Sequence, residues 1–249
     1  IVNAPIDHPL AQQWGISKAT LMMLIASGLL ILLFGFAMRA SRLKGAPKGW
    51  TNALEAVVLY IRDEVAYPAM GKSWGRRFTP FLCTLFFFIL YGNLLGLVPF
   101  GASATGNISV TAALAIISLI VVEVAGYKAL GPKGYMGTIF YIPKGIPKIM
   151  QVVMVIIMTP VELIGKVAKP FALAVRLFAN MTAGHFVVLS LLGLIIVYGG
   201  LSATGVAAVT GSLALGLFVM FLEIFVAFLQ AYIFTALTAV FIGLIRHAH

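Results

Sequence analysis

Six polar or ionisable side chains stand inside the most apolar part of this 249-residue chain. They are Glu162, Arg176, Asn180, His185, Glu223 and Gln230. A histidine and a carboxylate can exchange protons near physiological pH, whereas an arginine keeps its positive charge throughout that range. Ionisable residues are costly inside a membrane, and they mark ion pathways or proton relays there. These residue types therefore favour proton conduction.

Helical spacing places Arg176, Asn180 and His185 on two different faces of their helix. Asn180 follows Arg176 by four residues and shares its face, whereas His185 follows by nine residues and points to the opposite side. The other residues on the face of Arg176 are small, namely Ala172, Ala179 and Ala183. Small residues let another helix approach closely. Two faces with such different chemistry indicate two different partners.

The last two apolar stretches predict an antiparallel hairpin, in which residues equidistant from the turn lie at similar depth. The midpoint between His185 and Glu223 is residue 204, and the midpoint between Arg176 and Gln230 is residue 203. Both fall in the uncharged segment "GGLSATG", residues 199–205. We therefore expect His185 beside Glu223 and Arg176 beside Gln230.

Each of these residues also has a purely structural interpretation. An arginine at mid-membrane depth costs roughly 2.5–3.5 kcal/mol, and Arg176 could be a snorkelling or ion-paired residue. We favour function, with an acid of another subunit as its partner. The pair of His185 and Glu223 could instead staple the hairpin, and Asn180 and Gln230 could be interhelical hydrogen-bonding residues.

Other polar residues of the apolar stretches carry weaker signals. Glu162 marks an aqueous entrance or forms an ion pair with Lys166 and Lys169 on its own helix. Asn93 is interpreted as a packing residue. Cys83 is the only cysteine, so an intrachain disulfide is excluded. No nucleotide-binding or zinc-protease motif occurs, and we expect no cofactor and no catalytic metal.

The elements that position these residues follow from composition. The chain is 61% hydrophobic and only 10% charged, and its long apolar runs predict an all-α polytopic membrane protein. We expect a single membrane domain, residues 1–249, with about five membrane helices and one interfacial amphipathic helix. Its segments are a first span at 19–38, the interfacial helix at 50–70, spans at 78–98 and 108–127, and a long hairpin of 149–198 and 206–245. A helix of about 40 residues is about 60 Å long, twice the thickness of the hydrocarbon layer, so the hairpin is expected to be steeply inclined.

The net charge of +10 is explained by topology and does not predict nucleic-acid binding. Of the 17 Lys and Arg residues, 13 fall on one side of the predicted helices. The positive-inside rule then places the C-terminus in the cytoplasm and the N-terminus outside. Residues 1–17 do not resemble a signal peptide, and a start at Ile1 leaves processing or truncation open.

Three segments resemble the membrane subunit a of F-type ATP synthases, which is called subunit 6 in mitochondria. They are "PFALAVRLFANMTAGH", "YGNLLGLVP" and "FLQAYIFTALTAVFI", and the resemblance runs from about residue 75 to the end. "HPLAQ" near the N-terminus also resembles the start of that family. In many bacterial members Glu and His are exchanged between positions 185 and 223, so this chain is similar to the mitochondrial and alphaproteobacterial kind.

The resemblance implies a subunit that is not an enzyme on its own and that translocates protons in the bacterial inner membrane. Its partners would be the c-subunit ring, the peripheral-stalk b subunits, the other ATP synthase subunits and membrane lipids. Arg176 would attract each passing ring carboxylate and separate two half-channels. The outer half-channel or ring-facing site would be lined by Asn180, His185, Glu223 and Gln230, and Glu162 would lie by the cytoplasmic exit.

Two other classes of protein fit parts of the pattern. A self-contained secondary transporter or ion channel would show internal repeats and a midplane site between broken helices, and the two halves show no convincing repeat. A purely structural membrane subunit would not need Arg, His and Glu at mid-membrane depth.

Overall fold

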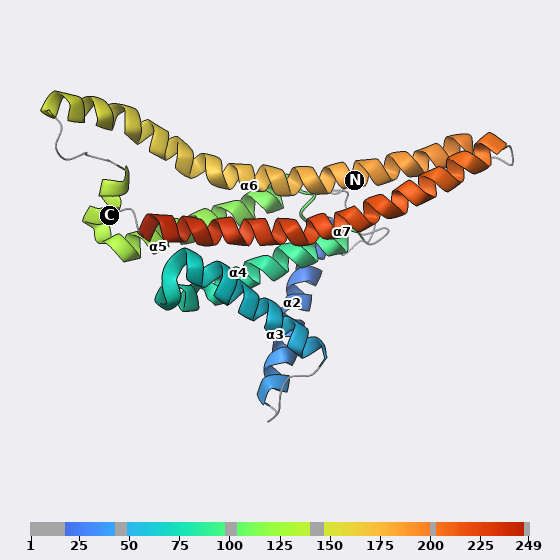
Figure 1. The fold of residues 1–249 in the computed structure, drawn as a ribbon, viewed down its shortest axis with the longest axis horizontal. Helices are drawn as coiled ribbons and strands as arrows, with labels where there is room; N and C mark the ends of the chain where they lie inside the picture. Colours follow the sequence, from blue (N-terminus) through green and yellow to red (C-terminus); the bar gives the residue numbers. More distant parts are fainter. Residues whose placement is uncertain (1–17, 43–48, 98–103, 140–146, 200–202, 247–249) are drawn as a thin grey trace, which may run out of the picture. The chain divides into compact units, whose positions relative to one another are not determined.

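The computed structural model describes residues 18–42, 49–97, 104–139, 147–199 and 203–246, and every element in them is a helix (Figure 1). The helices are α2 (Lys18–Arg42), α3 (Trp50–Tyr60), the π-helical η1 (Ile61–Ala66), α4 (Tyr67–Gly96), α5 (Ile108–Ile139), α6 (Lys148–Tyr198) and α7 (Ala203–Arg246). Residues 1–17, with the segment "HPLAQ", lie outside the described residues. The prediction of an all-α fold is confirmed.

Four helical stretches of the described residues are long and apolar enough to cross a membrane. They are Thr51–Gly96, Ile108–Thr138, Met150–Tyr198 and Thr204–Ile245, and Thr20–Gly35 is a shorter apolar helix. These stretches confirm a multi-pass membrane protein. The single-domain division, the interfacial position of residues 50–70 and the inclination of the hairpin stay predictions.

Helices α6 and α7 are both longer than a membrane requires. Helix α6 has 51 residues and continues through Pro160 and Pro170, and α7 has 44 residues. At 1.5 Å per residue they extend about 76 Å and about 66 Å, against a hydrocarbon layer of about 30 Å.

The chain divides into two compact units, and each long helix contributes to both. The first unit comprises residues 1–36, 86–111 and 176–232; the second comprises residues 37–85, 112–175 and 233–249.

The first unit is built on the hairpin of α6 and α7. Gly199 follows the last residue of α6, and its N–H donates to the carbonyl of Ile195 at 2.8 Å. A side chain on Gly199 would meet Val209 of α7 at 3.5 Å, so the two helices are in contact beside their connection. The end of α4 joins this unit, where Phe87 packs edge-on against Phe34 of α2 with ring centroids 5.2 Å apart.

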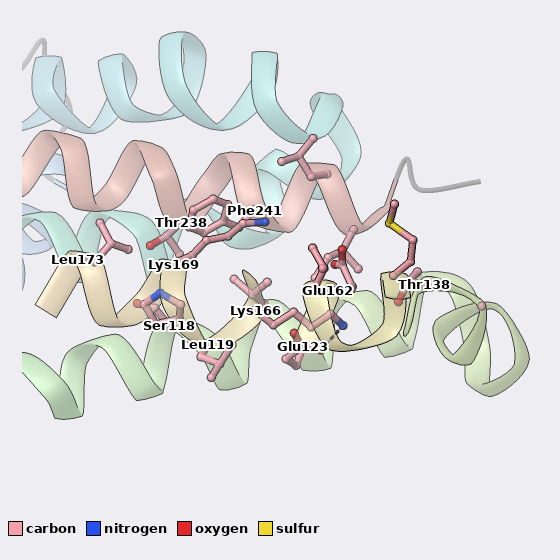
Figure 2. A pocket seen from close by; sticks show the side chains of 17 residues that line it. Ser118, Leu119, Glu123, Thr138, Glu162, Lys166, Lys169, Leu173, Thr238 and Phe241 are labelled. Carbon is pink, nitrogen blue, oxygen red and sulfur yellow. Dashed lines mark hydrogen bonds and ion pairs between the residues drawn. The ribbon is translucent and has the colours of Figure 1, made fainter. Parts of the chain in front are cut away.

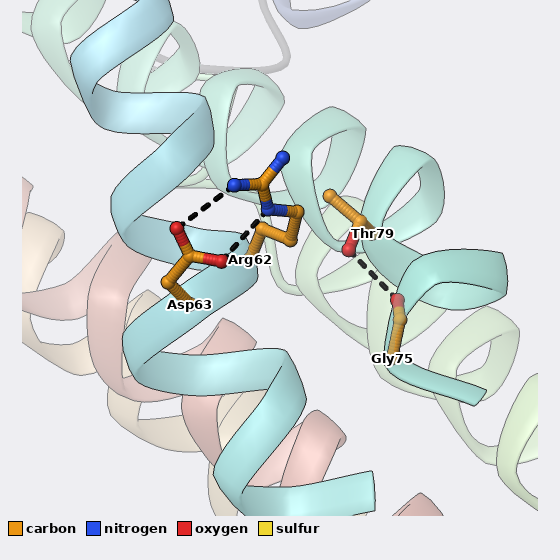
Figure 3. Close-up of polar contacts among 4 residues, drawn as sticks. All are labelled: Arg62, Asp63, Gly75 and Thr79. Atoms are coloured by element: carbon orange, nitrogen blue, oxygen red, sulfur yellow. Dashed lines mark hydrogen bonds and ion pairs between the residues drawn. The ribbon is translucent and has the colours of Figure 1, made fainter. Parts of the chain in front are cut away.

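The second unit contains two kinks that break long helices into shorter rods. Gly71 in α4 and Gly131 in α5 have positive φ angles of 76° and 69°, a conformation that glycine adopts without steric cost. Beyond the first kink, the Thr79 hydroxyl donates to the Gly75 carbonyl at 2.7 Å (Figure 3). Before it, the Arg62 guanidinium is paired with the Asp63 carboxylate at 2.8 Å, at the exposed side of η1.

Candidate functional site

The carboxylate of Glu223 is pressed against the backbone of the facing helix at Gly184. A Cβ atom built on Gly184 would lie 2.0 Å from Glu223 Oε1. A side chain at position 184 would force this carboxylate to move. The next residue of α6 is His185. Among the described residues, Glu223 Oε1 is buried and has no hydrogen-bond partner.

One turn of α6 before this contact, a second polar link joins the hairpin. The Asn180 side-chain amide donates to Gln230 Oε1 at 3.2 Å. Gln230 is only 1% exposed, and within the described residues its Nε2 group has no acceptor. An unpaired buried donor costs about 1–3 kcal/mol. This donor therefore calls for an acceptor that the described residues do not supply.

A small cavity connects these groups. Its volume is about 20 Å³, and it is lined by Asn93, Leu177, Asn180, Met181, Glu223, Val226, Ala227 and Gln230. A cavity of roughly 10–15 Å³ on this measure is enough for one water molecule, provided that two or more polar partners surround it. The amides of Asn180 and Gln230 and the carboxylate of Glu223 meet that requirement.

Arg176 does not line this cavity. Its side chain is exposed in the isolated chain, and it makes no hydrogen bond or ion pair with the residues that the structure describes. Ala179 and Ala183, which share its face of α6, are also exposed. The strip expected to receive another helix is therefore open.

Glu162 belongs to the second unit, where it lines a larger cavity of about 300 Å³ between α5, α6 and α7 (Figure 2). The expected pairing of Glu162 with Lys166 was wrong, because Lys166 Nζ reaches Glu123 on the facing helix α5 at 3.3 Å. The Tyr135 hydroxyl donates to the same Glu123 oxygen. Lys169 Nζ instead lies over the ring of Phe241, 5.2 Å from its centroid.

The structure thus brings three predicted residues, Asn180, Glu223 and Gln230, around one cavity. Sequence reasoning missed two contributors. Gly184 carries no chemistry of its own, and the only signal was its position before His185. Asn93 was interpreted as packing, although an amide within an apolar run must find partners. No cluster of three or more metal-ligating side chains occurs in the described part of the chain.

Comparison with known proteins gives a consistent result. The sequence profile of the family described as "ATP synthase A chain" matches residues 20–243. The chain is 46% identical over 233 residues to ATP synthase subunit a of Anaeromyxobacter dehalogenans, covering 93% of this chain and 58% of that protein. It is 47% identical to the subunit a of Chloroherpeton thalassium, covering 92% and 66%, and 45% identical to that of Myxococcus xanthus, covering 92% and 72%. The chain therefore spans less than two thirds of the length of the first two relatives.

Proposed function

The chain belongs to the ATP synthase A chain family, and we propose on this basis that it is the proton-translocating stator subunit of a rotary F-type ATP synthase. The family predicted from the sequence is thereby confirmed, and its mitochondrial and alphaproteobacterial-like character stays a prediction. In the proposed role the chain offers two aqueous half-channels to carboxylates on a rotating ring of c subunits. Proton flow through them turns the ring and drives ATP synthesis.

The polar cavity of the first unit supports the outer half-channel. Glu223 is the one titratable group among the described residues that line it, and His185 follows Gly184, against which the Glu223 carboxylate packs. A proton taken up by this pair is passed on towards the ring. Asn180 and Gln230 supply donors and acceptors for water along the way, and their amides do not titrate.

The observation that carries the proposal is that Arg176 is exposed and has no partner among the residues that the structure describes. A permanent cation at membrane depth is stabilised by a carboxylate or by water, and the described residues provide no carboxylate for it. Each deprotonated ring carboxylate pairs with Arg176 in turn, and the fixed positive charge prevents protons from passing directly between the half-channels. The small side chains on the face of Arg176, namely Ala172, Ala179 and Ala183, allow the ring helices to approach.

On the cytoplasmic side, Glu162 and its cavity form the exit path for protons. The paired charges of Glu123 and Lys166 make one wall of that cavity polar. The other proposed partners are the peripheral-stalk b subunits, the remaining ATP synthase subunits and lipids of the bacterial inner membrane. The excess of Lys and Arg on one side supports an N-terminus outside and a cytoplasmic C-terminus.

The test uses inverted membrane vesicles that contain the assembled complex. Arg176→Ala should abolish ATP-driven acidification, because ring carboxylates lose their counter-charge. Arg176→Lys is the matched control for charge without the guanidinium fork. Full acidification by Arg176→Ala would overturn the proposal, and so would proton transport by the reconstituted chain alone.

A second experiment tests the outer half-channel. His185→Ala and Glu223→Ala should each impair transport more than the double exchange His185→Glu and Glu223→His. If the exchange is as damaging as the two single losses, the two residues do not act as a pair.

A further inference from the structure

Asn93 is the polar residue of α4 that reaches the cavity of the first unit. It is only 3% exposed, and both ends of its amide are engaged. Its Oδ1 accepts a hydrogen bond from the Thr105 hydroxyl at 2.6 Å, and its Nδ2 lies 3.4 Å from the carbonyl of Ala227 on α7. A buried amide with both ends used fixes the orientation of its side chain.

The contact on α7 has a defined position relative to the titratable site. Ala227 follows Glu223 by four residues and precedes Gln230 by three, so all three lie on one face of α7. All three also line the same cavity as Asn93. Asn93 therefore holds α7 at the one turn that lies between the carboxylate and Gln230, whose Nε2 has no acceptor among the described residues.

The residue that clamps Asn93 is itself held tightly. Thr105 is fully buried, and a Cβ atom on Gly92 would lie 3.3 Å from the Thr105 methyl group. Gly92 precedes Asn93, so Thr105 is packed directly against the end of α4. This arrangement leaves the Asn93 amide little freedom to rotate away from Ala227.

We propose that Asn93 is a positioning residue for proton transfer, which holds Glu223 and Gln230 around a site for one water molecule. This inference rests on the function proposed above. The water accepts from Gln230 Nε2 and donates to Glu223 Oε1; both are buried atoms that have no hydrogen-bond partner among the described residues. The cavity volume of about 20 Å³ fits one such molecule. Asn93 takes no proton; it acts through the α7 backbone.

Asn93→Asp separates a positioning role from simple packing. A protonated aspartate has the shape of the amide, and its O–H can donate to the Ala227 carbonyl while its other oxygen accepts from Thr105. An ionised aspartate has no donor and repels that carbonyl. The flux of Asn93→Asp relative to the native complex should therefore fall as pH rises. Asn93→Leu should lose flux at every pH, by about 10- to 100-fold for a displacement near 1 Å.

Thr105→Val and Thr111→Val form a matched pair of variants. Both threonines are fully buried in the first unit. The Thr105 hydroxyl donates to Asn93, whereas the Thr111 hydroxyl donates to the Ile108 carbonyl of its own turn at 3.1 Å. Thr105→Val should lower the flux in the same direction as Asn93→Leu, and Thr111→Val should leave it near native.

The experiment measures proton flux per assembled complex in vesicles between about pH 5 and pH 8 (the lower limit lies near the ordinary titration range of aspartate), with assembly quantified for each variant. A native flux for Asn93→Leu or for Thr105→Val would overturn the inference. Lower assembly with unchanged flux per complex would show that Asn93 only packs, and would overturn it too. Arg176→Ala is measured in parallel. If Arg176→Ala still pumps protons, the proposed function fails. If Arg176→Ala loses pumping while the Asn93 variants keep the native flux, only the positioning role is refuted.

Discussion

Gly184→Ala tests whether the placement of Glu223 against α6 matters for transport. The added methyl carbon would lie 2.0 Å from Glu223 Oε1, 2.8 Å from Cδ and 3.1 Å from Cγ. Ordinary van der Waals contact begins at 3.4 Å, so the carboxylate oxygen must retreat by about 1.4 Å. These three atoms belong to the outer part of a flexible side chain, so Glu223 moves and the helices stay in place.

The magnitude follows from that displacement. A misplacement of about 1 Å in a reacting group can lower a rate about 100-fold. Alanine also favours the helix over glycine by about 1 kcal/mol, so α6 itself is not destabilised by the change. We expect proton flux per complex to fall between 10- and 100-fold, while the amount of assembled complex stays near native.

The assay is ATP-driven acidification of inverted vesicles, normalised to assembled complex. Gly193→Ala is the control, because nothing lies within 4 Å of a Cβ atom at that position of α6. Adding Glu223→Asp to Gly184→Ala shortens the acid by one methylene and should recover part of the flux. Native flux in Gly184→Ala would refute the reasoning, since the carboxylate would then work equally well from a different place.

Two further predictions concern contacts within the units. A double-mutant cycle with Asn180→Leu and Gln230→Leu should give a coupling of about 1 kcal/mol in thermal unfolding of the detergent-solubilised protein, since the two share a hydrogen bond; strictly additive effects would contradict that bond. Gly243→Ala should lower the stability by about 1–3 kcal/mol, because its Cβ atom would lie 2.0 Å from a backbone carbonyl of α4. Gly216→Ala, with nothing within 4 Å, should be neutral, and equal melting of the two variants would argue against this packing.

The sequence alone predicted the class of fold because long apolar runs leave few alternatives. It also predicted which side chains of α6 and α7 carry the chemistry, since polar residues in such runs are expensive. The midpoint of the predicted hairpin set Glu223 opposite residue 185, and in the structure its carboxylate lies at the neighbouring Gly184. Depth along a hairpin is thus accessible from residue counting.

The rotation of each helix about its axis, and the partners of side chains on other helices, could not be predicted from the sequence in the same way. Gln230 was expected beside Arg176, and its hydrogen bond is with Asn180, one turn further along α6. Lys166 forms its ion pair with Glu123, 43 residues earlier in the chain, although Glu162 lies one turn away on its own helix. The contact of Asn93 with Ala227 joins residues 134 apart. Each of these contacts depends on how the helices pack against one another, and a local sequence pattern does not predict that packing.

The most direct test of the central claim is a cross-link from the Arg176 face of α6 to the ring. Ala183→Cys lies on that face, while Leu189→Cys lies on the far side and is 55% exposed in the isolated chain. Each is combined with a cysteine beside the carboxylate of the c subunit and oxidised in native membranes. We predict disulfide formation at Ala183→Cys that blocks rotation and ATP-driven pumping, and little at Leu189→Cys. Equal yields at both positions, or a higher yield at Leu189→Cys, would contradict the claim that Arg176 faces the rotor.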